Sequence, residues 1–95
     1  MRLKREQITC LKEEIDRIVR NAKVYLFGSR VDDDAKGGDI DILVLTDSKL
    51  SKIDISKIRV RFQNQCGLQK LDLINYTKSS ISPFKNLILN DSIEL

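Results

Sequence analysis

Two aspartates separated by a single residue stand at the start of an apolar run. Asp39 and Asp41 flank Ile40, and the apolar run continues to Leu45. In a β-strand, side chains two residues apart project to the same face, so both carboxylates would point one way while Ile40 faces the core. The two like charges repel each other unless a cation lies between them. Because Mg²⁺ prefers oxygen ligands and binds through one or two carboxylates plus substrate phosphates, the pair predicts a magnesium site.

A Gly-Ser turn precedes this pair. Gly28 and Ser29 end a short apolar run, and Arg30 follows them. Glycine lets the backbone approach a phosphate closely, and free backbone N–H groups bind its oxygens. We therefore expect Gly28, Ser29 and Arg30 to contact the phosphate groups of a substrate. The alternatives are a glycine that only ends a strand and an arginine that only faces solvent.

A third carboxylate, Asp72, lies in a later apolar stretch. Alternation places it on one strand face with Ile74, and burying a carboxylate there is costly without a nearby cation. The competing interpretation is an acid on an edge strand that reaches solvent. For Asp39 and Asp41 the competing interpretation is a pair of solvated strand-start residues.

Taken together, these features resemble the signature of the DNA polymerase β-like nucleotidyltransferases. That signature is a hydrophobic strand, Gly-Ser, a spacer near ten residues, Asp-hydrophobic-Asp and a third carboxylate on a later strand. Residues 24–30, residues 38–44 and Asp72 match it in order, with a spacer of nine residues after Ser29. Within the superfamily, the chain is most similar to the minimal nucleotidyltransferases, which are single catalytic domains.

The resemblance implies a function and a ligand set. Asp39 and Asp41 would bind two Mg²⁺ ions, and Asp72 would complete the shell of one ion and help deprotonate the attacking hydroxyl. The reaction would transfer a nucleoside monophosphate from an NTP, most simply AMP from ATP. Minimal nucleotidyltransferases are paired with a small helical HEPN protein, for which they act as antitoxin by adenylylating a tyrosine of the HEPN ribonuclease. The acceptor surface would come from such a partner or from a second copy of the chain.

Two other functions stay open at this point. One is an antitoxin that neutralises its partner by binding alone. The other is a nucleic-acid-directed transferase, since Lys57, Arg59 and Arg61 form a one-sided basic group that suits a polyanion. Nucleic acid is the least favoured partner, because the sequence lacks a concentrated basic surface with interleaved aromatics.

Length, charge and composition restrict the class of protein. The 95 residues predict one domain, 1–95, and carry a net charge of +3 with no histidine, which excludes imidazole catalysis. We find no signal segment and no membrane span, so we expect a cytoplasmic protein. Cys10 and Cys66 have no pairing or metal-binding spacing, and we expect no disulfide in that compartment. Cys66 is expected to be a small buried apolar residue.

The elements that must position the carboxylates follow from periodicity and capping signals. An α/β or α+β domain is predicted, with a small mixed sheet of three to four strands and helices packed on one face. Asn21 is expected to end the first helix in the left-handed region, and Ser51 and Ser82 are expected to cap later helices. The predicted elements are a helix over 3–21, a strand over 23–27, a short helix after the Gly-Ser turn, a strand over 39–45, a helix from 51 ended by Gly67, a strand within 68–76, a helix from 83 and a short strand within 92–95.

Overall fold

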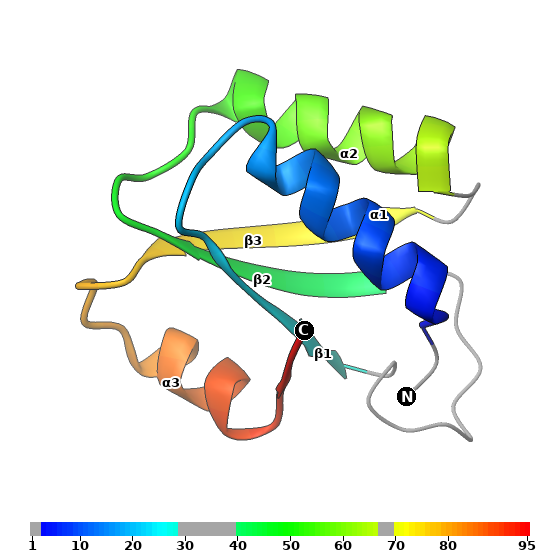
Figure 1. Ribbon diagram of the computed structural model, residues 1–95. Helices are drawn as coiled ribbons and strands as arrows, with labels where there is room; N and C mark the ends of the chain where they lie inside the picture. Colours follow the sequence, from blue (N-terminus) through cyan, green and yellow to red (C-terminus); the bar gives the residue numbers. More distant parts are fainter. Residues whose placement is uncertain (1–2, 29–39, 67–69) are drawn as a thin grey trace.

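The computed structural model describes residues 3–28, 40–66 and 70–95 (Figure 1). The predicted short helix after the Gly-Ser turn and the helix stop at Gly67 lie outside these residues. The elements in chain order are α1 (Arg5–Asp16), β1 (Lys23–Phe27), β2 (Ile40–Thr46), α2 (Lys52–Cys66), β3 (Leu71–Thr77), α3 (Pro83–Asn90) and β4 (Ile93–Glu94). No helix in the described part of the chain is long and apolar enough to cross a membrane.

The four strands form one mixed sheet in the order β3-β2-β1-β4. β1 runs antiparallel to both of its neighbours, whereas β2 and β3 are parallel. The parallel pair needs a crossover connection, and α2 supplies it between the end of β2 and the start of β3. The predicted fold class, an α/β domain with a small mixed sheet, is therefore confirmed.

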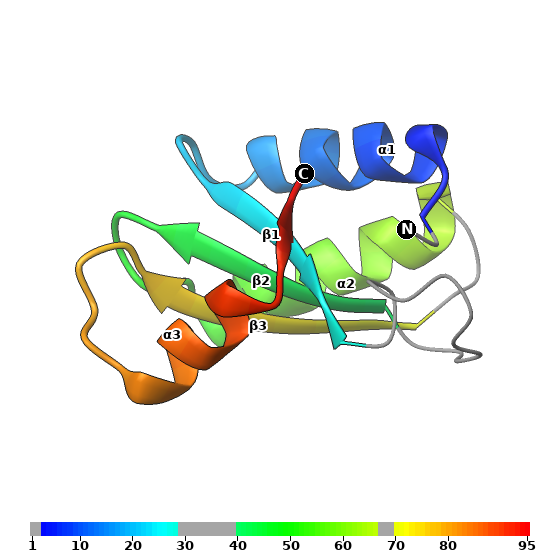
Figure 2. The ribbon, with the colours of Figure 1, turned by 90° about the horizontal axis from the view of Figure 1, so that it is seen from below.

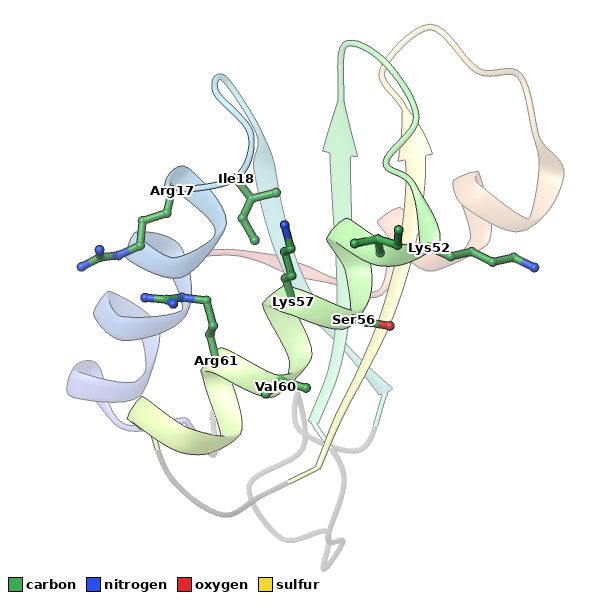
Figure 3. Close-up of a pocket in the computed structure, with 8 residues that line it drawn as sticks. Arg17, Ile18, Lys52, Ser56, Lys57, Val60 and Arg61 are labelled. Atoms are coloured by element: carbon green, nitrogen blue, oxygen red, sulfur yellow. The ribbon is translucent and has the colours of Figure 1, made fainter.

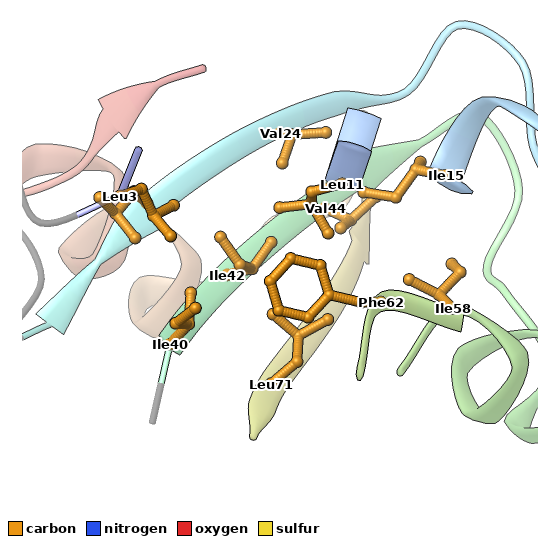
Figure 4. Packing of buried hydrophobic residues seen from close by; sticks show 11 residues of the cluster. Leu3, Leu11, Ile15, Val24, Ile40, Ile42, Val44, Ile58, Phe62 and Leu71 are labelled. Atoms are coloured by element: carbon orange, nitrogen blue, oxygen red, sulfur yellow. The ribbon is translucent and has the colours of Figure 1, made fainter. Parts of the chain in front are cut away.

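The main core lies between the sheet and the two helices α1 and α2. Leu11 and Ile15 of α1 and Phe62 of α2 are fully or almost fully buried against β2 residues such as Ile42 (Figure 4). Burying each side chain of this size contributes roughly 1.5–3 kcal/mol, so this layer supplies much of the folding free energy. The apolar periodicity predicted for the first helix is confirmed by this packing.

The third helix lies on the opposite face of the sheet. Ile88 of α3 packs with Leu43 and Leu45 in a second, smaller cluster, and Figure 2 shows α3 across the sheet from α1. The expectation that helices cover one face therefore holds for α1 and α2 and is corrected for α3. The reason is that β2 is apolar on both sides, so its second face also needs a cover.

The structure confirms the predicted helix caps but not the predicted length of the first helix. The Ser51 hydroxyl accepts a hydrogen bond from Asp54 N at 3.0 Å, and Ser82 accepts one from Lys85 N at 3.3 Å, so both caps are confirmed. The first helix ends at Asp16 instead of residue 21, and the following residues turn toward β1. Asn21 has a φ of 61°, as expected for a left-handed residue, but it lies in this turn.

A disulfide joins α1 to α2. Cys10 and Cys66 are paired, with their Cα atoms 5.7 Å apart and a sequence separation of 56. The expectation of two unpaired cysteines was wrong. The two helices pack side by side on the same sheet face, and sequence spacing alone does not reveal that contact.

A buried asparagine ties the parallel strands to the connection that follows β2. Asn75 Nδ2 donates hydrogen bonds to Val44 O at 2.9 Å and to Thr46 Oγ1 at 3.0 Å. Its Oδ1 accepts a hydrogen bond from Leu50 N at 2.8 Å. One side chain of β3 thus holds both β2 and the start of the α2 crossover in place.

Lys85 links β3 to α3 through hydrogen bonds. Its side chain is buried, and its ammonium donates to the carbonyl oxygens of Thr77 at 3.1 Å, Lys78 at 2.9 Å and Ser80 at 2.9 Å. Three main-chain acceptors of the β3–α3 connection are therefore satisfied by one cation.

We predict that Asn75→Ala lowers the free energy of unfolding by roughly 2–4 kcal/mol, because it leaves buried hydrogen-bonding groups unsatisfied. Urea denaturation followed by circular dichroism measures the change. Asn64→Ala, at an exposed position of α2, is the matched control and should stay within about 0.5 kcal/mol. Equal effects of the two substitutions would contradict the structural role of Asn75.

We predict that reducing the Cys10–Cys66 bond lowers stability by roughly 2–4 kcal/mol, since the bond closes a long loop in the unfolded chain. Thermal unfolding with and without a thiol reductant measures this difference. The Cys10→Ser, Cys66→Ser double variant should show the same melting temperature in both buffers. A wild-type protein that is insensitive to reductant would disprove the contribution.

Candidate functional site

Asp41 and Asp72 are direct neighbours in the sheet. They are Cα partners in the parallel pairing of β2 with β3. Partners in register lie on adjacent strands about 4.8 Å apart, and their side chains point to the same face. Both residues are only half-buried. The fold therefore brings two carboxylates from distant parts of the sequence side by side.

The carboxylate pair lies on the face of the sheet that α3 partly covers. Alternation along β2 places Asp41 on the same side as Leu43 and Leu45, which pack against Ile88. That helix lies near the carboxyl ends of β2 and β3, whereas the two aspartates are at the amino ends (Figure 1). Among the described elements, no helix covers this end of the face.

Gly28 forms the third component. It follows Phe27, the antiparallel partner of Asp41, and has a φ of 73°. A Cβ at this position would lie 3.1 Å from Asp41 Cγ and still closer to Oδ2. Any other residue would therefore strain the backbone and collide with the carboxylate. Glycine at position 28 does more than end β1, because it leaves room for the acidic side chain.

Three of the six predicted site residues are thus found together: Gly28, Asp41 and Asp72. The other three, Ser29, Arg30 and Asp39, lie outside the described residues. Within the described ranges, no group of three potential metal ligands occurs.

The donor set of the pair fits a hard divalent cation. Asp41 and Asp72 offer carboxylate oxygens on one side of the sheet, and Mg²⁺ binds such oxygens while it retains water or phosphate ligands. A cation between them would also neutralise the repulsion of two adjacent negative charges.

One contact that fixes this geometry has no signal in the sequence. Ile40 N donates a hydrogen bond to Lys70 O at 2.9 Å, which aligns the amino ends of the two parallel strands. Since these residues are 30 positions apart (70 − 40), a pattern search within either strand cannot reveal their register. The family signature, rather than a pattern within the strand, implied that Asp72 belongs to the same site as Asp41.

We predict that Gly28→Ala lowers the free energy of unfolding by roughly 1–3 kcal/mol through backbone strain and its contact with Asp41. Chemical denaturation of Gly28→Ala, Asp41→Ala and the double variant separates the two causes. In the Asp41→Ala background the penalty should shrink, because only the strain of the positive φ remains. Strict additivity of the two substitutions would show that the side-chain contact is unimportant.

Comparison with known proteins gives one family and several similar folds. The family model described as "Polymerase beta, Nucleotidyltransferase" matches residues 5–95. A search among curated proteins finds no significant match. Solved structures, by contrast, match over nearly the whole chain.

Two of these structures are toxin–antitoxin complexes. A chain in the complex of a tri-AMPylated Shewanella oneidensis HEPN toxin with an MNT antitoxin is 20% identical and has a TM-score of 0.63. The match covers 93% of this chain and 70% of that chain. A chain in a toxin–antitoxin complex with AMP-PNP is also 20% identical, with a TM-score of 0.70 over 94% of this chain and 68% of that one.

A third similar structure comes from Sulfolobus solfataricus and has been assigned provisionally as a nucleotidyltransferase. It is 26% identical to this chain and has a TM-score of 0.55. The match covers 94% of this chain and 81% of the other.

Proposed function

Because the chain belongs to the polymerase β nucleotidyltransferase family, we propose that it transfers AMP from ATP, or NMP from another NTP, to a hydroxyl of a partner protein. The observation that carries this proposal is the in-register pairing of Asp41 with Asp72 beside Gly28. The proposed partner is a small helical HEPN-type toxin. This choice is supported by the structural similarity to complexes of an MNT antitoxin with an AMPylated HEPN toxin and of a toxin–antitoxin with AMP-PNP.

The proposed site divides the work among its residues. Asp39, Asp41 and Asp72 would hold Mg²⁺, with two ions expected from the family resemblance. When bound, the metal supplies charge stabilisation for the phosphoryl oxygens of the transition state. Gly28, with Ser29 and Arg30, would bind and orient the triphosphate so that its α-phosphorus faces the acceptor.

The proposed chemical step transfers AMP from ATP to the acceptor hydroxyl. The acceptor hydroxyl oxygen forms a bond to the α-phosphorus of ATP while the bond from that phosphorus to the bridging oxygen breaks. AMP is then esterified to the acceptor and pyrophosphate leaves. Asp72 is the proposed acceptor of the hydroxyl proton, because it is the carboxylate on the outermost strand of the pair.

We predict that Asp41→Asn and Asp72→Asn each reduce AMP transfer by about 100-fold or more, since each removes a negative ligand from the metal. The assay uses labelled ATP with the co-expressed partner, with and without a chelator. Asp16→Asn, which changes an exposed carboxylate at the end of α1, is the matched control and should retain wild-type transfer.

A second readout separates catalysis from binding. Titration with Mn²⁺ followed by electron paramagnetic resonance should show weaker metal binding in both site variants and unchanged binding in the control. Transfer that persists in Asp41→Asn would refute the proposed enzyme. Neutralisation of the toxin by a variant without any transfer activity would indicate an antitoxin that acts by binding alone.

A further inference from the structure

An open groove lies between the end of α1 and the first two thirds of α2 (Figure 3). Its volume is about 970 Å³. The carboxylates stand at the amino ends of β2 and β3, next to the end of α2, whereas the groove is formed mainly by the beginning of that helix. The groove is lined by Arg17, Ile18, Lys52, Ile53, Ser56, Lys57, Val60 and Arg61.

The lining is strongly cationic. Four of its residues are lysine or arginine, and no carboxylate is among the described residues that line it. Glu14 is buried and forms ion pairs with two of these cations, with Arg17 at 3.6 Å and with Arg61. Glu14 therefore holds two guanidinium groups beside the groove, whose lining residues carry four positive charges.

The groove also exposes apolar surface that the core does not use. Ile53 is 68% exposed and Val60 is 54% exposed. They are seven residues apart on α2, so both lie on one face with Lys57 between them. The core of the protein uses another face of the same helix, through Ile58 and Phe62. Exposed apolar residues framed by charges are typical of a protein-binding surface.

We propose that this groove docks an acidic amphipathic helix of a partner protein. Such a helix presents apolar residues and carboxylates at three- and four-residue spacings, which complement the alternation of Ile53, Lys57 and Val60. Its carboxylates pair with Lys52, Lys57 and the two arginines held by Glu14. The proposal does not depend on nucleotide transfer, because the surface lies apart from the carboxylate pair.

A nucleic acid is the less suitable occupant. Nucleic-acid grooves that bind single strands combine cations with aromatic side chains on which bases stack. The described lining of this groove contains no aromatic residue, and its exposed non-polar residues are aliphatic.

The test uses a labelled peptide of about four helical turns with leucines at heptad-like spacing and glutamates on the flanking positions. Binding is measured by fluorescence anisotropy at roughly physiological ionic strength, and the bound surface is mapped by ¹⁵N–¹H chemical shifts. A peptide of the same composition in scrambled order and an oligouridylate serve as competing probes. We expect shifts concentrated at Ile18, Ile53 and Val60 for the ordered peptide.

Matched variants locate the interaction. Lys57→Glu should weaken peptide binding by about tenfold, whereas Arg59→Glu reverses an exposed charge on the same helix outside the groove and should change it less than about twofold. Val60→Ser should also weaken binding by about fivefold, and Ile81→Ser, which alters an exposed apolar residue elsewhere, should not.

Four results would overturn the proposal. They are no saturable binding of the ordered peptide, equal binding of the scrambled peptide, equal effects of Lys57→Glu and Arg59→Glu, and tighter binding of oligouridylate with no effect of Val60→Ser. The last result would assign the groove to nucleic acid. None of them bears on AMP transfer, so the proposed enzyme stands or falls separately.

Discussion

The structure depends on the parallel register between β2 and β3. A shift of one residue along either strand would move Asp72 to the other face of the sheet and separate it from Asp41. The register is held by the hydrogen bond from Ile40 to Lys70 at one end and by the Asn75 side chain toward the other. Parallel pairs have no tight turn to set their alignment, so side-chain and terminal contacts carry that role.

This register costs folding free energy, because it places two negative charges on neighbouring strands. Two carboxylates side by side repel each other by about 1 kcal/mol at contact distances in water, and by more where solvent is partly excluded. The protein limits the cost by leaving both aspartates half-buried, and Gly28 removes the steric conflict with Asp41. The large apolar layer under α1 and α2 supplies the stability that makes such a pair tolerable. A divalent cation bound by both aspartates, as proposed, would offset this repulsion.

The sequence predicted the features that depend on local order. Short patterns predicted the strand of 23–27, the strand that is observed as Ile40–Thr46, the caps at Ser51 and Ser82, and the family, and the structure and the comparisons bear these out. It did not predict the features that depend on which elements meet. The bond between Cys10 and Cys66 and the placement of α3 on the second face arise from packing between distant segments. Lys85 belongs to the same class, because nothing near it in sequence shows that three carbonyl groups will converge on its ammonium. The structure places Gly28, Asp41 and Asp72 together, and the roles of all six site residues, including Ser29, Arg30 and Asp39, remain predictions.

β3 is the outermost strand on its side of the described sheet. One flank of Asp72 is therefore not screened by another strand in the described part of the chain, whereas Asp41 is enclosed between β1 and β3. A large folded molecule can approach a group at the edge of the sheet from the side. If the proposed transfer takes place, this strand order leaves Asp72 open to a large acceptor from the side of the sheet, whereas Asp41 lies between two strands.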